Sequence, residues 1–141
     1  MFLYLDTSSL VKLYVEEKNS RTVSTLVTSS RATATSLIAY TEARAAFARR
    51  FREKAFTARA YKGIISSFNK DWDNYLMVQV TRKVVLLAGD LAEKHRLKSL
   101  DAIHLSSALT LSSELSSPII FSCSDNKLQK ASEVETLYQP A

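Results

Sequence analysis

The 141-residue chain has few of the residues that form cross-links, zinc sites and tight turns. Its one cysteine, Cys123, excludes an internal disulfide and a cysteine-based zinc site. The two histidines, His95 and His104, are too few for a typical zinc centre. Because only two glycines and two prolines are present, we expect few turns and a predominance of helices.

Long hydrophobic runs are also absent from the sequence. No run reaches the roughly 18 residues of a membrane span, and the apolar stretch at the N-terminus is cut off at Asp6 rather than continuing as a signal peptide. We therefore expect a cytoplasmic protein with no membrane partner. Hydrophobic residues still make up 46% of the chain, which is enough for one domain over residues 1–141 with a full core.

Basic residues outnumber acidic ones, with a net charge of +5 and a pI near 9.4. The excess is concentrated in one basic segment, in which Glu53 is the only acid. Its basic residues are Arg44, Arg49, Arg50, Arg52, Lys54, Arg59 and Lys62. Such a segment can be a solvated helix face, or it can bind nucleic acid or a partner protein. The sequence leaves both interpretations open.

Short apolar runs alternate with helical patterns along the chain, which is typical of an α/β domain with a largely parallel sheet flanked by helices. The predicted strands cover residues 2–5, 31–35, 77–80 and 118–122, with a last edge strand at 135–137. The predicted helices, counted from their capping residues, cover 7–15, 20–27, 36–54, 57–72, 81–95, 99–113 and 126–132. Several of these helices have a hydroxyl residue as the expected N-cap, namely Thr7 or Ser8, Ser20, Ser36, Thr57 and Ser99.

Four acidic residues occupy places where an ordinary soluble domain would rarely have them. Asp6 and Asp125 follow apolar runs that are predicted to be strands, and Glu42 lies among apolar neighbours in a predicted helix. Asp101 lies in the first turn of another predicted helix, where free N–H groups and the helix dipole stabilise an ionised carboxylate. Because sites in parallel α/β sheets form beyond the carboxyl ends of the strands, the fold could bring all four acids to one pocket.

A pocket of carboxylates is typical of a site for a hard divalent cation such as Mg²⁺ or Mn²⁺. Carboxylates held close together repel one another, which raises some of their pKa values, and a bound cation reverses that penalty. The cation would then polarise a phosphoryl oxygen and activate water for phosphodiester cleavage.

Each acid also has a purely structural interpretation. Asp6 could cap a helix, Glu42 could pair with a distant arginine, Asp101 could stabilise its helix N-terminus, and Asp125 could be a turn residue. The four together favour a metal site more strongly than any one of them does, because the predicted fold brings them to the same edge of the sheet.

Two other kinds of α/β protein place an aspartate after the first strand. A haloacid-dehalogenase-type phosphatase needs a second aspartate two residues later, where this chain has Ser8. A response-regulator receiver needs an acidic pair beside its phosphorylated aspartate, and this chain has a lone acid there. The chain also has no P-loop and no Rossmann glycine motif, so all of these classes are disfavoured.

Four segments around the acids carry a family resemblance. They are YLDTSSLVKLY at 4–14, SLIAYTEARAA at 36–46, LKSLDAIHLSSA at 97–108 and FSCSDNKL at 121–128. The third segment is the most specific and the fourth is the loosest. On these segments the chain resembles the PIN-domain ribonucleases, and most closely the VapC-type toxins of type II toxin–antitoxin systems. The resemblance spans essentially the whole chain, in the expected order and spacing.

The resemblance implies a PIN-like three-layer α/β/α sandwich with a mostly parallel central sheet. It also implies an endoribonuclease that depends on Mg²⁺ or Mn²⁺ and hydrolyses RNA phosphodiester bonds with a metal-activated water. The metal would be held by Asp6, Glu42 and Asp101, with Asp125 assisting and Ser8 supporting the first acid.

Partners are implied by the same resemblance. VapC-type toxins are usually homodimers that act on RNA and are inhibited by a cognate antitoxin. The basic segment would then bind RNA or the antitoxin through Arg44, Arg49, Arg50 and Arg52. A housekeeping PIN nuclease in RNA processing and a catalytically silent PIN binding module are the two alternatives.

The sequence departs from the family pattern at a few positions. Cys123 stands two residues before Asp125, where a serine or threonine is common, and a thiol is a weaker hydrogen-bonding group. Two positions that are often glycine hold other residues, and Asn19 at the first of them tolerates a positive φ. His104, one helical turn beyond Asp101, could be a supporting group near the site, but we favour its interpretation as a packed helix residue.

Overall fold

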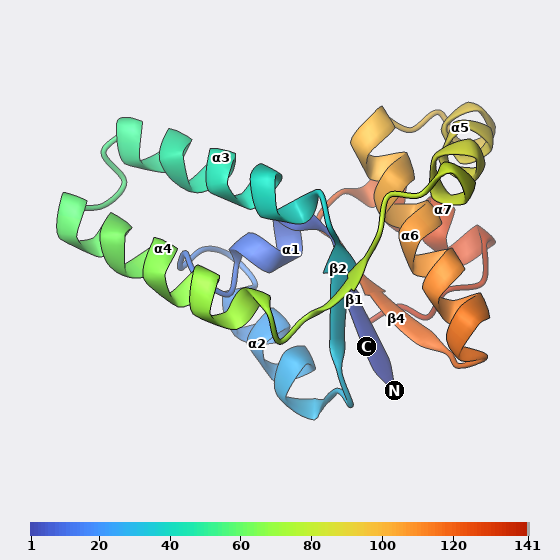
Figure 1. Ribbon diagram of the computed structural model, residues 1–141, viewed down its shortest axis with the longest axis horizontal. Coiled ribbons are helices and arrows are strands. Elements are labelled where there is room, and N and C mark those ends of the chain that lie inside the picture. Colours follow the sequence, from blue (N-terminus) through green and yellow to red (C-terminus); the bar gives the residue numbers. More distant parts are fainter. Residues whose placement is uncertain (141) are drawn as a thin grey trace.

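Four short strands form a parallel sheet at the centre of the protein (Figure 1). The computed structural model describes residues 1–140, and within them the strands are β1 (Phe2–Leu5), β2 (Thr33–Ser36), β3 (Leu76–Val78) and β4 (Ile119–Ser122). They lie in the order β3-β2-β1-β4, and each neighbouring pair is parallel. The prediction of a largely parallel sheet is confirmed.

Helices cover both faces of this sheet. They are α1 (Thr7–Val11), α2 (Ser20–Ser29), α3 (Ala39–Arg52), α4 (Ala58–Trp72), α5 (Arg82–His95), α6 (Ser99–Leu115) and α7 (Asn126–Val134). Figure 1 shows α1 to α4 on one side of the sheet and α5 to α7 on the other, so the predicted three-layer sandwich is confirmed. Among residues 1–140, no helix combines the length and hydropathy that a membrane crossing requires.

The alternation of side chains along β1 builds a hydrophobic core on each face of the sheet. Leu3 and Leu5 join the core beneath α1 to α4, together with Phe47 and Phe68. Tyr4, between them, joins the core formed with α5, α6 and α7. All three β1 side chains are fully buried, so the central strand is fixed from both sides and holds its C-terminal end in place.

The helices α3 and α4 form a hairpin that extends away from the sheet (Figure 1). Aromatic side chains join the two helices. The rings of Phe47 and Phe68 meet edge to face with centroids 5.4 Å apart, and Tyr40 stacks on Phe68 at 5.4 Å. Such ring pairs contribute about 0.5–1.5 kcal/mol each beyond their buried area, so ring packing holds the hairpin together.

The first helix differs from its prediction at both ends. Its N-cap is Asp6 rather than Thr7 or Ser8, and the Asp6 carboxylate accepts a hydrogen bond from the N–H of Ser9 at 3.0 Å. The helix ends at Val11, and the chain continues in turns rather than in helix to residue 15. Aspartate is as effective an N-cap as serine, and its place directly after β1 gives it this role.

Three other predicted caps are also wrong. Ser36 is the last residue of β2, Ser99 lies inside α6 behind the N-cap Lys98, and Ser20 lies inside α2 behind the N-cap Asn19. Asn19 has a φ of 71°, so its predicted suitability for a left-handed position is confirmed. The helices are where the hydrophobic pattern predicts them, and the errors concern where they begin and, for α1, where it ends.

The predicted edge strand at 135–137 is wrong. The last helix continues to Val134, and the following tail makes only an isolated bridge between Ile120 and Tyr138. In this bridge the N–H of Tyr138 donates to the carbonyl of Ile119 at 3.1 Å. The tail therefore closes the edge of β4 without forming a ladder of its own.

Candidate active site

Asp6 lies at the C-terminal end of β1, where its backbone N–H donates to the carbonyl of Ser122 in β4 at 3.1 Å. The residue is 5% exposed, and its Oδ1 accepts hydrogen bonds from the Ser8 hydroxyl at 2.7 Å and the Ser9 N–H at 3.0 Å. Burial raises the pKa of Asp6, against the opposing effects of nearby His104 and of these hydrogen bonds. Asp6 is therefore a helix cap and also a fixed, buried carboxylate at the sheet edge.

Glu42 reaches the same edge from the first turn of α3. Its Oε1 accepts a hydrogen bond from the Thr7 hydroxyl at 2.7 Å and lies 2.9 Å from Nε2 of His104. Burial acts to raise the pKa of Glu42, but the hydrogen bonds from His104 and Thr7 outweigh burial and lower it. The ion-pair partner of Glu42 within residues 1–140 is thus a histidine, not a distant arginine.

His104 connects the candidate site to the core. It projects from α6 and is 2% exposed, with Nδ1 2.8 Å from the Tyr4 hydroxyl and Nε2 within reach of both Glu42 and Thr7. If Tyr4 donates to Nδ1, the tautomer with hydrogen on Nε2 donates to Glu42, and both ring nitrogens are satisfied. The favoured interpretation of His104 as a packed helix residue is right about its burial but did not include its contact with Glu42. Its spacing from Asp101 was the only signal in the sequence, and spacing does not identify a partner on another helix.

Asp101 and Asp125 lie on the β4 side of this edge. Asp101 is partly buried in the first turn of α6, whereas Asp125 is exposed and caps α7, its Oδ1 accepting the N–H of Lys127 at 3.2 Å. Burial raises the pKa of Asp101, and the negative charges of Asp125 and Glu42 add to the rise. The charge of Asp101 in turn contributes to the raised pKa of Asp6. Asp101 is therefore electrostatically coupled to each of the other three carboxylates.

Ser8 links Asp6 to the loop between β4 and α7. Its hydroxyl donates to Asp6 and accepts the N–H of Ser124 at 3.2 Å. Beside it, the thiol of Cys123 lies 3.5 Å from the backbone carbonyl of Asp125. Burial, followed by the charge of Asp6, raises the pKa of Cys123 to about 12, so the thiol is neutral near pH 7 and is structural rather than reactive.

The donor set of this edge suits a hard divalent cation, although it is not closed into a cage. Within residues 1–140, no three His, Cys, Asp or Glu side chains are grouped tightly enough, as they stand, to hold a metal ion. Carboxylate oxygens are nevertheless the donors that Mg²⁺ and Mn²⁺ prefer. No Lys or Arg of the described chain forms an ion pair with Asp6, Asp101 or Asp125. His104 and Lys98 offset part of the repulsion among these carboxylates, and a cation would offset the rest.

Two of the four candidate arginines of the basic segment have intramolecular roles. Arg50 forms a salt bridge with Glu17. Arg44 donates to the hydroxyl of Tyr40 at 2.7 Å and lies over its ring at 5.6 Å. The guanidinium group of Arg50 thus ties α3 to the segment before α2, whereas that of Arg44 makes its contacts within α3.

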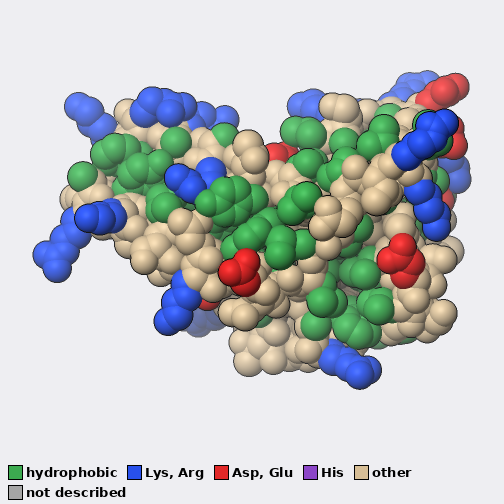
Figure 2. Space-filling view, in the orientation of Figure 1, with side chains coloured by type: hydrophobic (Ala, Val, Ile, Leu, Met, Phe, Trp, Pro, Cys, Tyr) green, Lys and Arg blue, Asp and Glu red, His purple; other side chains and the backbone are tan. Residues whose placement is uncertain are grey.

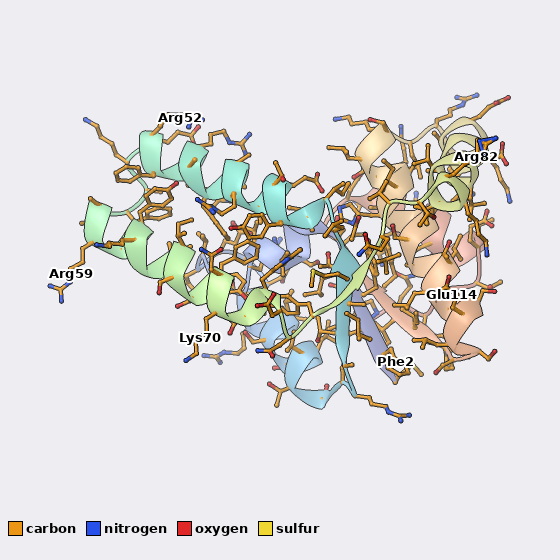
Figure 3. All side chains as sticks on the ribbon, in the orientation of Figure 1. Phe2, Arg52, Arg59, Lys70, Arg82 and Glu114 are labelled. Carbon is orange, nitrogen blue, oxygen red and sulfur yellow. The ribbon has the colours of Figure 1, made fainter. Side chains whose placement is uncertain are left out.

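The other two arginines lie beside the acids. Arg49 and Arg52 line a hollow of about 420 Å³ along α3, together with Thr7 and Glu42. Figure 2 shows Lys and Arg side chains around the outer end of the α3–α4 hairpin, and Figure 3 labels Arg52 and Arg59 near that end. A polyanion reaching Glu42 along α3 would therefore pass basic side chains.

Comparison with known protein families identifies the relationship. The PIN domain family matches residues 3–133, a range that includes all four acids. The chain belongs to the PIN domain family. The resemblance predicted from the sequence is confirmed, and it extends over nearly the whole chain.

Two curated relatives of this PIN domain come from Mycobacterium tuberculosis. They are ribonuclease VapC45 of strain CDC 1551 / Oshkosh and ribonuclease VapC49 of strain ATCC 25618 / H37Rv. Each is 34% identical over 113 residues, covering 77% of this chain and 76% of the relative. This similarity agrees with the predicted resemblance to VapC-type proteins.

Solved structures share the PIN domain fold. FitAcB from Neisseria gonorrhoeae matches with a TM-score of 0.65 and 14% identity, covering 100% of this chain and 97% of that chain. VapBC2 from Rickettsia felis, bound to a DNA fragment from its promoter, matches with a TM-score of 0.63 and 12% identity. This match covers 99% of this chain and 97% of that chain. At such low identity the likeness shows the fold alone.

Proposed function

We propose that this PIN domain is a Mg²⁺- or Mn²⁺-dependent endoribonuclease and the toxin of a toxin–antitoxin pair. The observation that carries the proposal is the gathering of four carboxylates around the C-terminal ends of β1 and β4. Hydrogen bonds of Thr7 and Ser8, which follow Asp6, reach Glu42 and the loop of Asp125, and Asp101 is electrostatically coupled to the other three acids. The curated relatives named ribonuclease VapC give the site its substrate class.

The cation would be held by Asp6, Glu42 and Asp101, with Asp125 assisting from the loop before α7. Each of these carboxylates retains at least one oxygen without a hydrogen-bond partner among the described residues. Bound there, a divalent cation would polarise a phosphoryl oxygen of the RNA and make water a better nucleophile. Oxygen donors on three separate elements can adjust their side-chain torsions around such an ion.

Neighbouring residues keep Glu42 in the ionised form and hold Asp6 in place. Thr7 and His104 donate to Glu42 and lower its pKa, so this carboxylate is charged at neutral pH. Ser8 and the backbone of Ser9 fix one oxygen of Asp6 and leave the other free. Such preorganisation reduces the rearrangement needed when an ion and a phosphodiester bind.

The partners proposed here are an RNA substrate, a cognate antitoxin and a second copy of the chain, in the cytoplasm. Structural neighbours support the antitoxin, since they include VapBC-1 from nontypeable Haemophilus influenzae and a toxin–antitoxin complex from Klebsiella pneumoniae. The hollow of Arg49 and Arg52 beside Glu42 is the proposed contact for RNA or for an antitoxin.

RNA cleavage by the purified protein tests the proposed activity. Asp6→Asn and Asp101→Asn each remove a negative charge with little change in shape, and they are expected to lower Mg²⁺- or Mn²⁺-dependent cleavage at least about 100-fold. Asp90→Asn, on the exposed face of α5, is the matched control and should retain full activity. Full activity in either site variant would contradict the assignment.

Expression in cells separates a toxin from a housekeeping nuclease. Induction of the wild-type chain is expected to arrest growth, and Asp6→Asn should not. Co-expression of the antitoxin from the neighbouring gene should restore growth. Harmless expression of an active nuclease would favour a role in RNA processing instead.

A further inference from the structure

A second hollow, of about 510 Å³, adjoins the acidic edge on the side of α2 and α7. Cys123 and Ser124 line it, and the next residue along the chain is Asp125. Lys12 and Lys18 line its opposite wall. Its volume falls in the range of roughly 300–1,000 Å³ that is usual for sites of small organic ligands.

Hydrogen bonds connect this hollow directly to the candidate catalytic residues. The N–H of Ser124, in the wall, donates to the Ser8 hydroxyl at 3.2 Å, and that hydroxyl donates to Asp6 at 2.7 Å. Ser9 and Ser122 also line the hollow, and their hydroxyls lie 2.9 Å apart. The wall of the hollow is thus linked to Asp6 by two successive hydrogen bonds, through Ser124 and Ser8.

The walls combine apolar and amide side chains. Val23 and Leu26 contribute an apolar part, and Gln129 and Gln139 contribute amides. The Oε1 atom of Gln139 is buried and has no hydrogen-bond partner among the described residues. A buried acceptor without a donor is costly, so a ligand N–H that reached it would gain free energy. A nucleobase offers flat apolar faces and an edge of N–H donors and acceptors, which matches these walls.

The charge of the hollow suits a phosphate. Its charged lining residues within residues 1–140 are Lys12 and Lys18, with no carboxylate among them. Glu17 forms salt bridges with Lys12 and with Arg50, and Lys18 forms no salt bridge with any carboxylate of residues 1–140. The hollow is therefore positive, whereas the adjoining edge of Asp6, Asp101 and Asp125 is negative. A phosphodiester chain could place one phosphate at each.

We propose that this hollow binds one nucleotide of the RNA substrate, adjacent to the phosphodiester bond that is cleaved at the acidic edge. The base would lie against the apolar and amide walls, and its phosphate near Lys12 and Lys18. This assignment rests on the proposed ribonuclease function and adds to it a place for the base beside the scissile bond.

Binding of the four nucleoside 5′-monophosphates to the full chain tests the proposal without any metal. Titrations followed by amide NMR shifts, in the presence of EDTA, should perturb Ser124, Gln129 and the first turn of α2. Inorganic phosphate at the same concentration should produce much smaller shifts. Equal shifts with phosphate alone, shifts confined to other residues, or no shifts at millimolar nucleotide would overturn the proposal.

A large side chain that fills the hollow provides a second test, and the same substitution elsewhere on α2 provides its control. Thr22 is exposed on α2 and lines the hollow, and Thr25 is exposed on the same helix and does not line it. Thr22→Trp is expected to weaken nucleotide binding at least about tenfold, which corresponds to 1.4 kcal/mol, and Thr25→Trp to leave it unchanged. Gln129→Ala, which removes one amide without filling space, should weaken binding several-fold.

Cleavage kinetics separate an RNA subsite from a site for a free nucleotide. For an RNA subsite, Thr22→Trp should raise KM for a short RNA about tenfold, with Thr25→Trp as the control. Nucleotide binding that is lost in Thr22→Trp while KM is unchanged would overturn the RNA assignment. The nuclease function is tested separately, because Asp6→Asn should lose cleavage and still bind nucleotide in EDTA.

Discussion

At the level of single residues, the hydrogen bonds of His104 decide how Glu42 is presented. The imidazole lies between the Tyr4 hydroxyl in the core and the Glu42 carboxylate at the sheet edge. Neither the burial of His104 nor its spacing from Asp101 predicts this, because its partners come from β1 and α3. His104 is thus a positioning residue that acts on the proposed chemistry through Glu42.

Replacement of His104 by phenylalanine tests this role. His104→Phe keeps a buried ring and removes both hydrogen bonds, so Glu42 loses a donor and the Tyr4 hydroxyl loses its partner. We expect kcat for RNA cleavage to fall about 10–100-fold with little change in KM, and stability in urea to fall by about 1–3 kcal/mol.

A second substitution separates positioning from stability. In the double variant Tyr4→Phe/His104→Phe no hydroxyl is left without a partner, so part of the lost stability should return while kcat stays low. Recovery of kcat together with stability would show that His104 is only a structural residue.

At the level of helices and strands, hydrophobic periodicity predicts which elements form but not how they end. The apolar run of residues 2–5 and the helical pattern of residues 57–72 correspond closely to β1 and α4. The start of α1 was misassigned because Asp6, Thr7 and Ser8 are all good N-caps, and the chain leaving β1 selects among them. The strand predicted at 135–137 is absent because residues 135 and 136 form a turn after α7, and the tail meets β4 only in the single bridge of Tyr138.

Because glycine is scarce, non-glycine residues adopt the left-handed conformation at some helix ends. Within residues 1–140, the five residues with positive φ are all non-glycine, and Arg96 and Ser116 among them end α5 and α6 in the left-handed conformation. A residue with a Cβ atom is strained there by roughly 1 kcal/mol relative to glycine.

Glycine at such a helix end should stabilise the protein. Ser116, with φ of 48°, is exposed and ends α6, and Ser116→Gly is expected to raise stability by about 0.5–1 kcal/mol. Ser113→Gly, inside the same helix and also exposed, is the matched control and should lower stability by about the same amount. Urea unfolding curves of both variants check the pair, and a loss of stability in Ser116→Gly would refute the strain argument.

At the level of the whole molecule, the candidate site lies where the three layers meet. Asp6 comes from the sheet, Glu42 from one helical layer, and Asp101 and His104 from the other. The parallel sheet could be predicted from the sequence well enough to expect the acids at one edge, since the carboxyl ends of parallel strands share that edge. The hydrogen-bond partners of each acid could not be predicted from the sequence, because they depend on side-chain packing between the layers.

The C-terminal tail is tied to α5 by a charge cluster that gives a pH test. Hydrogen bonds from Lys94 and then from His95 lower the pKa of Glu135 below its ordinary value. A carboxyl whose pKa is lowered in the folded state adds stability above its ordinary pKa and loses that contribution as the pH falls through the lowered value.

Glu135→Gln removes this contribution at neutral pH. We expect the variant to be about 1 kcal/mol less stable than the wild type at pH 7, where the exposure of Lys94 limits the effect. Because the wild-type carboxyl is protonated in both states at sufficiently low pH, the difference should shrink steadily below pH 4.5, the ordinary value. Urea unfolding of both proteins at pH 7 and pH 3 measures the difference in stability. A larger difference at pH 3 than at pH 7 would contradict the stabilising role of the ionised Glu135.

Binding of Mn²⁺ tests most directly the central claim that one cation site joins the carboxylates at the sheet edge. Electron paramagnetic resonance of free Mn²⁺ during a titration measures the bound fraction for the wild type, Asp6→Asn, Asp101→Asn and the exposed control Asp90→Asn. The account predicts binding by the wild type and Asp90→Asn at millimolar or lower Mn²⁺, weakened at least about tenfold in the two site variants. No binding by the wild type at millimolar Mn²⁺, or equal binding by all four proteins, would contradict it.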